Sequence, residues 1–557
     1  MRAIASACLI AAAVVLAPSA GSQTLPRLAV QGQPYSEGNI TVHLHGVTGQ
    51  PALLAWGLDP LDPPLATGKG EYHIGTLASV FGLGTIPAAG RIDVPLALPA
   101  FPPSAAGQHV VLQGYVPGQL SNPASLPLDP PYLLPVNAIV IDHPEPSFKA
   151  NFGDKLAVGD FNADGVMDLA VGAWFETVDG IDYAGRVYVM WGPDFAAYTA
   201  LQSPAPGFRK QFGNGLAVAD FDADGVDDLV IGEGTGGDPP TPGVPGLLRV
   251  YRGSPAFSTR PALTITSAAT GLGSYIFGRA IAAGDLDADG LPDLVVGTPS
   301  ANVDGHDRAG AFEVFHGPAW GPPVVIQNPE PKPLDFFGFP VTMADVTGDG
   351  ILDIVEASGR AKVGNVSQAG RIHIYDGPTL SLLATIDNPQ PTANARFGEG
   401  LLAADLDGDG LAELVVADVK NNAYIVRNPL NAPTFEKRSK PPSPNPKPGA
   451  TSFGYFIAAT DANGDTLDDI VISDVFEGDV QGCGPMGGSG SLYVALAPYF
   501  STFYRIPNPF GQCGESFSWS FIASDLTGIG IDELVNGNPT ADAGNVFNAG
   551  RVVILLR

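Results

Sequence analysis

The sequence predicts an all-β fold, a seven-bladed β-propeller preceded by a small antiparallel β-sandwich-like domain. Three observations lead to this prediction. One unit of about 60 residues recurs seven times, which is typical of a repeat architecture. Each unit offers short apolar runs for four strands, and seven such units are typical of a propeller. The 557 residues include 70 Gly and 53 Pro but only 15% charged residues, a composition that favours many short strands joined by turns.

The chain begins with a predicted secretory signal over residues 1–22. Arg2 is followed by an apolar run up to Ala17 and then by small residues, and this order is typical of a signal peptide cleaved near residues 20–23. The alternative for this segment is a buried first strand or helix. No later segment is long and apolar enough for a membrane span. We therefore expect a secreted or cell-surface product.

Residues 23–135 lack the repeat and are predicted to form the small β domain. The runs 40–47, 71–77, 91–98 and 109–116 alternate apolar and polar residues, as half-buried strands do. His43 and His45 lie two residues apart, so they share one face of a strand. They are either solvent-facing or a metal pair, and the sequence offers no third ligand.

The repeats occupy residues 136–557, and each opens with a phenylalanine, a short apolar strand and an acidic loop. Glycine follows this phenylalanine in the first six repeats, and Ser518 follows it in the seventh. The seven loops begin at Asp160, Asp220, Asp285, Asp345, Asp405, Asp461 and Asp525 and are called loops 1 to 7 below. Residues 138–142 resemble the last strand of a repeat whose other strands are missing, and the seventh repeat lacks that strand. We therefore expect residues 138–142 to close the last blade and remove the exposed edges.

Loops 1 to 6 are predicted calcium sites. Side-chain oxygens at positions 1, 3, 5 and 9 and a carbonyl at position 7 suit a cation that takes six to eight oxygen ligands. A single such loop is equally an ordinary turn, but six copies favour the metal. The candidate ligands are Asp160, Asn162, Asp164, Val166, Asp168, Asp220, Asp222, Asp224, Val226, Asp228, Asp285, Asp287, Asp289, Leu291, Asp293, Asp345, Thr347, Asp349, Ile351, Asp353, Asp405, Asp407, Asp409, Leu411, Glu413, Asp461, Asn463, Asp465, Leu467 and Asp469.

Some loops depart from the pattern. Thr347 replaces an acid in loop 4, Glu413 is longer than aspartate, and Thr466 replaces the bend glycine of loop 6. Loop 7 has lost three ligands, so we expect no ion there. Cys483 and Cys513 remain after Cys8 leaves with the signal, and an oxidising compartment favours a disulfide over two free thiols. The Pro- and Lys-rich stretch 436–449 is predicted as an exposed loop, solvated or docking an acidic partner.

The Phe-Gly opening, the DxDxDGxxD loop and the AGRVYV-type strand resemble the FG-GAP repeats of the integrin α-subunit propeller and its bacterial secreted relatives. The resemblance covers about residues 138–557. It implies a seven-bladed propeller whose loops bind calcium on one face and whose last blade is closed by an N-terminal strand. No segment matches integrin legs, a transmembrane tail or an inserted domain, so integrin-type adhesion is not implied.

Two functions are compatible with the sequence. The first is a non-catalytic, calcium-stabilised scaffold that recognises an extracellular protein or glycan. The second is a secreted hydrolase or lyase, but the eight histidines are scattered and no nucleophile elbow or phosphate loop occurs. A formal charge of −29 disfavours nucleic acid as a partner. The sequence makes no prediction about the oligomeric state.

Overall fold

The computed structural model divides into two compact units, one up to Leu134 and one from Pro135. In the first unit the structure describes the backbone of the strands only. In the second it describes 137–557 except 235–244, 269–276, 319, 442–451, 463–466, 478–488, 498–499, 501–502, 510–513, 527–531, 544–545 and 557. Cys483, Cys513, Asn463 and Asp465 therefore lie outside the described residues, as does the predicted signal segment.

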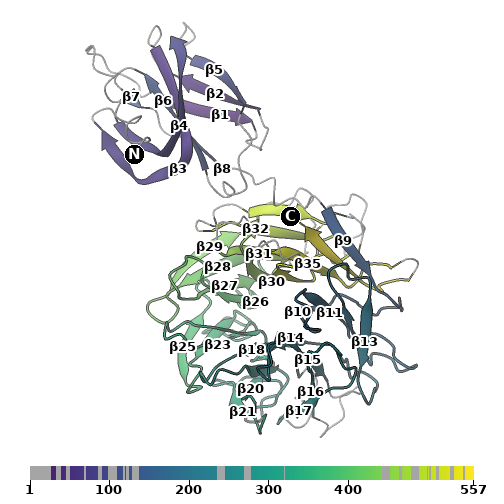
Figure 1. Ribbon diagram of the computed structural model, residues 1–557. Coiled ribbons are helices and arrows are strands. Elements are labelled where there is room, and N and C mark those ends of the chain that lie inside the picture. The colour runs from purple at the N-terminus through teal and green to yellow at the C-terminus, as the bar shows by residue number, and fades with distance from the viewer. Residues whose placement is uncertain are drawn as a thin grey trace. The chain divides into compact units, whose positions relative to one another are not determined.

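The first unit consists of two antiparallel sheets (Figure 1). One sheet has the order β1-β2-β5, and the other has the order β4-β3-β6-β7 with β8 also paired to β6. The four runs predicted as strands fall in β2, β4, β5 and β6. The strands are β1 (Arg27–Gly32), β2 (Asn39–His45), β3 (Pro51–Thr67), β4 (Gly70–Thr85), β5 (Arg91–Ala97), β6 (His109–Val116), β7 (Gln119–Leu120) and β8 (Ala124–Pro127).

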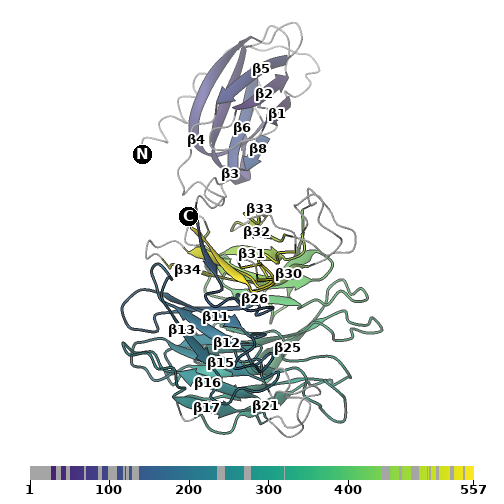
Figure 2. The ribbon, with the colours of Figure 1, turned by 90° about the vertical axis from the view of Figure 1, so that its right-hand side faces the viewer.

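The second unit is a ring of seven four-stranded antiparallel sheets, which confirms the predicted propeller (Figures 1 and 2). Blades 1 to 3 are β10 (Lys155–Gly159), β11 (Asp168–Ala173), β12 (Arg186–Met190), β13 (Tyr198–Gln202); β14 (Leu216–Ala219), β15 (Asp228–Glu233), β16 (Leu247–Tyr251), β17 (Leu263–Thr266); and β18 (Ile281–Gly284), β19 (Asp293–Thr298), β20 (Ala311–Phe315), β21 (Val324–Gln327). The first strand of each blade contacts the first strand of the next, in the order β10, β14, β18, β22, β26, β30, β34 and back to β10.

Blades 4 to 7 repeat the same order of strands. They are β22 (Val341–Ala344), β23 (Asp353–Ser358), β24 (Arg371–Tyr375), β25 (Leu382–Asp387); β26 (Gly400–Ala404), β27 (Glu413–Asp418), β28 (Asn422–Arg427), β29 (Thr434–Ser439); β30 (Phe453–Thr460), β31 (Asp469–Asp474), β32 (Ser491–Ala495), β33 (Phe503–Pro507); and β34 (Ser520–Ser524), β35 (Glu533–Asn538), β36 (Arg551–Leu556), β9 (Asn137–Asp142). No helix among the described residues is long and apolar enough to cross a bilayer.

An N-terminal strand closes the ring, as the sequence predicted. β9 pairs antiparallel with β36, with Ile141 opposite Val552 and Ile139 opposite Ile554. Arg551 Nε donates a hydrogen bond of 2.6 Å to Asp142 Oδ1 beside this pair. The last blade therefore has four strands like the other six, and no sheet in the ring is left with three.

The apolar core lies between neighbouring blades. The second strand of every blade is buried at each residue, because adjacent sheets cover both of its faces. Phe152 is fully buried in a cluster that joins blades 1 and 7, together with Leu169, Val535 and Ile554. The phenylalanine that opens the first repeat thus packs between two blades.

Glycine is required where the backbones of two blades touch. Gly310 of blade 3 forms a bridge with Phe337, the first residue of the next repeat. Its φ is +94°, and a Cβ there would overlap the backbone N and O of Phe337. The close approach of the blades explains the Ala-Gly that precedes the third strand.

The prediction of a loop over residues 436–449 is wrong at its start. Residues 436–439 belong to β29, which pairs with β28. The reason is local packing, because the Lys437 ammonium lies 5.7 Å from the centre of the Tyr424 ring, so the stem of a charged residue covers the sheet. Residues 442–449 lie outside the described residues.

Candidate cation loops

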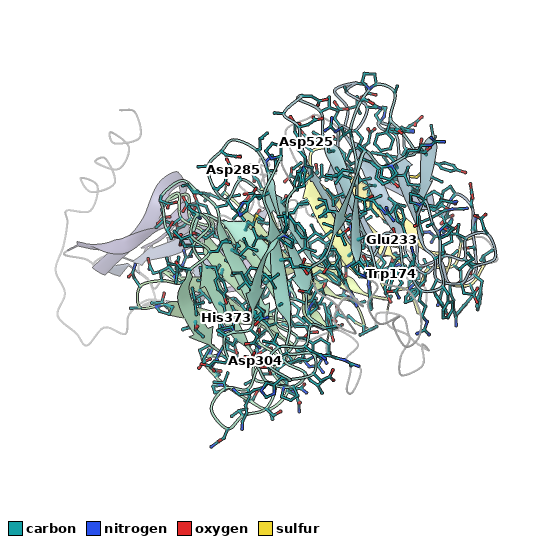
Figure 3. All side chains as sticks on the ribbon, turned by 90° about the horizontal axis from the view of Figure 1, so that it is seen from below. Trp174, Glu233, Asp285, Asp304, His373 and Asp525 are labelled. Atoms are coloured by element: carbon teal, nitrogen blue, oxygen red, sulfur yellow. The ribbon has the colours of Figure 1, made fainter. Side chains whose placement is uncertain are left out.

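Each acidic loop connects the first and second strands of a blade. In loop 1 Asp160 follows β10 and Asp168 is the first residue of β11. Between them Ala163 and Gly165 adopt positive φ of +61° and +81°, and this bend turns the intervening side chains back toward the strand ends. Figure 3 shows Asp285 and Asp525, the first residues of loops 3 and 7, on the same side of the sheets.

The position-1 carboxylate organises the loop. Asp160 accepts hydrogen bonds from the backbone N–H groups of Asp164 (3.2 Å) and Gly165 (2.8 Å). The equivalent bonds in loops 2, 3 and 5 measure between 2.8 and 3.2 Å. In loop 4 the Thr347 hydroxyl lies 3.4 Å from Asp345 Oδ1, so the replacement residue still turns toward the position-1 acid.

The position-9 carboxylate is buried and ties the loop to the third strand. Asp168 accepts the N–H of Phe161 at 3.1 Å and the N–H of Gly192, just after β12, at 2.9 Å. The same pair of bonds recurs in blades 2, 3, 4 and 6. These acids therefore have a structural role in addition to any role as ligands.

Burial raises the pKa of these position-9 acids. The pKa of Asp168 and of Asp228 is raised to about 6, because burial costs more than their backbone hydrogen bonds return, and the nearby loop carboxylates add to the shift. The pKa of Glu413 is raised to about 7, chiefly by burial. Such a carboxylate is costly to keep ionised without a neighbouring positive charge.

The carboxylates of three loops converge within 4.8 Å of one another. The groups are Asp220, Asp222 and Asp228 in loop 2; Asp285, Asp287 and Asp289 in loop 3; and Asp405, Asp407 and Glu413 in loop 5. Glu413 reaches its group despite its extra methylene. Loops 1 and 4 carry Asn162 and Thr347 in place of one acid. In loop 6 Asp461, Leu467 and Asp469 are described, and Asp469 is buried.

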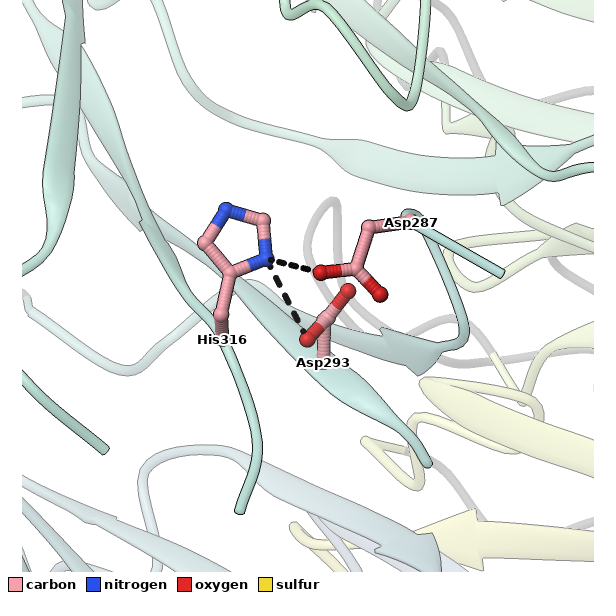
Figure 4. A group of neighbouring side chains, drawn as sticks. All are labelled: Asp287, Asp293 and His316. Atoms are coloured by element: carbon pink, nitrogen blue, oxygen red, sulfur yellow. Dashed lines mark ion pairs between the residues drawn. The ribbon is translucent and has the colours of Figure 1, made fainter. Parts of the chain in front are cut away.

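A positively charged or imidazole side chain faces three of the loops, and these residues were not predicted. His316 Nδ1 lies 3.5 Å from Asp287 Oδ2 and 3.3 Å from Asp293 Oδ1 (Figure 4). In loop 2 Arg252 is paired with Asp222 at 2.8 Å, and in loop 5 Arg427 is paired with Asp407 at 2.5 Å. All three stand at the end of a third strand, a position that alignment of the repeats would have highlighted.

An open hollow lies beside loop 1. It has a volume of about 710 Å³ and is lined by Asn162 and Asp164 of the loop, by Trp191 after β12 and by 255–257 of blade 2. The rings of Trp191 and Phe257 meet edge to face at 5.5 Å. Aromatic surface therefore lies next to the oxygens of the loop.

The fold and these loops define a class of protein, a seven-bladed β-propeller with an acidic loop on each blade. Comparison with protein families gives a closer assignment. Residues 152–190 and 277–314 match the family model "FG-GAP repeat", and residues 345–416 and 405–472 match "FG-GAP-like repeat". Four segments of the propeller therefore match FG-GAP repeat models, and the fold is a propeller of FG-GAP repeats.

Curated relatives are similar over part of the chain. Human phosphatidylinositol-glycan-specific phospholipase D is 32% identical over 186 residues, which cover 30% of this chain and 21% of that protein. Integrin alpha-5 of Xenopus laevis is 29% identical over 251 residues, or 43% and 23% of the two chains. Integrin alpha-7 of Rattus norvegicus is 35% identical over 157 residues, or 27% and 13%. The chain thus spans about a fifth of the length of these relatives or less.

Proposed function

We propose that this protein is a secreted, non-catalytic scaffold whose propeller binds calcium in loops 1 to 6 and recognises an extracellular protein or glycan. The observation that carries the proposal is the convergence of three carboxylates within 4.8 Å in loops 2, 3 and 5. Carboxylates so close repel one another unless a cation lies between them. Calcium suits the site because it takes many oxygen ligands in flexible geometry.

The loops should differ in affinity. Arg252 and Arg427 already pair with loops 2 and 5, so a cation must compete with a guanidinium there. Among the described residues no Lys, Arg or His pairs with the acids of loops 1 and 4. Loops 2 and 5 carry more carboxylates but also a competing charge, so we expect their calcium to dissociate first as salt or chelator is raised.

The extracellular location rests on the N-terminal pattern over residues 1–22 and on the loops themselves. Calcium loops with dissociation constants of about 10⁻⁴–10⁻³ M fill only where free calcium is near the millimolar range. We infer that the mature chain begins near residues 20–23, that residues 23–135 form a separate domain and that Cys483 pairs with Cys513. Mass spectrometry of the secreted product, with and without reductant, tests the cleavage site and the disulfide.

An enzyme is the alternative, because one group of relatives carries the name of a phospholipase. The shared segment covers 21% of the human enzyme, so its activity does not transfer with the repeat. Among the described residues, the groups of three carboxylates that lie within 4.8 Å of one another are those of the loops, and using them as acid and base would remove them from the cation. We therefore favour the binding scaffold.

Calcium titration by calorimetry tests the proposal. We expect up to six equivalents to bind the full chain, and Asp285→Ala to remove one equivalent. Asp304→Ala is the matched control, because Asp304 is an exposed acid of the same blade outside the loop. Equal stoichiometry in the two variants, or no heat of binding in the parent protein, would show that the loops are plain turns.

A further inference from the structure

A cluster of cationic and aromatic side chains lies near the ends of the first strands that are opposite to the acidic loops. Lys155 is the first residue of β10, Arg279 and Phe339 precede β18 and β22 by two residues, and Phe456 lies in β30. Trp174 directly follows β11 and Glu399 directly precedes β26. These six residues form the axial cluster. The loops lie at the opposite ends of the same strands, and Figure 3 shows Trp174 well apart from Asp285 and Asp525.

Residues of blades that are not neighbours meet in the axial cluster. The Lys155 ammonium of blade 1 lies 6.0 Å from the centre of the Phe456 ring of blade 6. The Arg279 guanidinium of blade 3 lies 5.6 Å from the Trp174 ring of blade 1 and 5.5 Å from the Phe339 ring of blade 4. Such contacts are possible only where side chains reach toward the axis of the ring.

Blade 2 leaves the space through which Arg279 reaches Trp174. Its first strand is preceded by Gly215, and a Cβ on this glycine would overlap the backbone oxygen of Gly278 and lie 3.2 Å from Arg279 Cα. A side chain at this position would therefore displace the segment that carries Arg279. The absence of one in blade 2 makes the contact between blades 1 and 3 possible.

Asp154 Oδ1 lies 4.0 Å from Lys155 Nζ, so in the described part of the propeller only the Arg279 charge of the axial cluster is left without an ion pair. Arg279 has no ion pair among the described residues, and its Nε is buried without a hydrogen-bond partner. The Trp174 side chain is also unsatisfied, because this residue is only 8% exposed and its Nε1 has no partner. Burial lowers the pKa of Lys155 to about 8, an effect that Asp154 opposes and Arg279 strengthens. The axial cluster thus contains two buried donors without hydrogen-bond partners and two cations, Lys155 and Arg279, whose charges affect each other.

Polar acceptors complete the surroundings. Glu399 Oε1 lies 3.9 Å from Arg396 Nη1. Burial raises the pKa of Glu399, and the positive charges of Arg396, Arg360 and Arg279 oppose this shift. Phe339 keeps 36% of its surface exposed, so a flat apolar face is open beside the guanidinium. The chain as a whole carries −29, which makes an excess of cations at one place on the ring unusual.

We propose that the axial cluster binds an acidic saccharide, with a uronate carboxylate on Arg279 and Lys155 and a sugar ring against Phe339. A guanidinium binds a carboxylate through two parallel hydrogen bonds. The aromatic faces suit the apolar face of a sugar, and Glu399 accepts hydrogen bonds from its hydroxyl groups. The inference deepens the proposed function and rests on the chain being a binding scaffold.

Calorimetry on the full chain, with calcium equal in cell and syringe, tests the inference. The probes are trigalacturonate, its fully methyl-esterified form and a triglutamate peptide. We expect trigalacturonate to bind, and Arg279→Gln to weaken it about tenfold to a hundredfold, as expected for a lost charge-assisted contact. Arg308→Gln is the matched control, because Arg308 lies in the same blade with 54% of its side chain exposed, and it should bind like the parent.

Each other outcome overturns the inference. Equal affinity of the Arg279→Gln variant, with an unchanged melting temperature, would place the ligand elsewhere. Equal affinity for the methyl ester would exclude a carboxylate contact, and tighter binding of triglutamate would reassign the cluster to an acidic peptide. If trigalacturonate fails to bind while calcium still binds, the axial site fails but the calcium scaffold stands. If calcium itself fails to bind, the proposed function fails whatever the saccharide does.

Discussion

Removal of calcium should lower the thermal stability of the propeller. A ligand that binds only the folded state stabilises it by RT ln(1 + [L]/Kd). With dissociation constants of about 10⁻⁴–10⁻³ M and about 1 mM free calcium, each loop contributes roughly 0.4–1.4 kcal/mol. Six loops together contribute about 2–8 kcal/mol, provided that the sites act independently.

This free energy converts into a measurable change of melting temperature. The unfolding entropy of globular proteins is about 2.1 cal/mol/K per residue, so a propeller of about 420 residues has roughly 0.9 kcal/mol/K. Chelation should therefore lower Tm by about 2–9 °C. Circular dichroism melts in excess EDTA, compared with 1 mM calcium at matched ionic strength, give the value directly.

The controls separate the loops from general screening. Sodium chloride at the same ionic strength should leave Tm nearly unchanged, because the effect depends on ligands and not on the screening of surface charge. A chain whose Tm is the same in EDTA and in calcium would refute the reasoning. In that case the backbone hydrogen bonds to Asp160 and Asp168 would be sufficient to hold the loop.

Three further predictions concern the packing of the ring. Gly310→Ala should lower the free energy of unfolding in urea by about 3–5 kcal/mol, because Gly310 has a positive φ and a Cβ there would overlap the next blade. Gly290 has a φ of +87° and no atom within 4 Å of its Cβ position, so Gly290→Ala should lower it by only about 1–2 kcal/mol. Equal losses in the two variants would contradict the close approach of the blades at Gly310. Ile141 is 7% exposed, so Ile141→Ala should lower the free energy of unfolding by about 2–4 kcal/mol. Val140 is 42% exposed, so Val140→Ala should lower it by less than about 1 kcal/mol. The reverse order would mean that the opposite face of β9 is buried. Burial lowers the pKa of Lys155 from its ordinary value of 10.5 to about 8 in the folded state, so between these two pH values the unfolded state binds more protons than the folded state. The free energy of unfolding should therefore rise with pH across that window by up to about 3 kcal/mol, and Tm should rise with it. A Lys155→Met variant that keeps the same rise would exclude this residue as its source.

The ring and its loops were predictable because each rests on a local pattern that repeats. Asp160, Gly165 and Asp168 lie within nine residues, and their spacing alone brings the strand ends together. The closing strand was predictable because residues 138–142 have the sequence of a fourth strand. Local spacing and repetition were sufficient for both.

The remaining features depend on contacts that no short window contains. His316 follows Asp293 by 23 residues and meets it only because the second and third strands of blade 3 are paired. Arg279 and Trp174 are separated by a whole blade, and they meet because the ring curves back and blade 2 has a glycine between them. Sequence patterns that repeat within one blade carry no signal for residues that occur once per ring.

The pairing of β9 with β36 also sets the order of events when the protein is made. Asp142 and Arg551 are 409 residues apart, so at about 5–20 residues per second the ribosome needs roughly 20–80 s to deliver the partner of a strand that it has already finished. During that time β9 has an unpaired edge, which is a template for association with other chains. A chain that stops short of the last strand would keep this edge open permanently, and prematurely terminated products should therefore aggregate more readily than full-length protein.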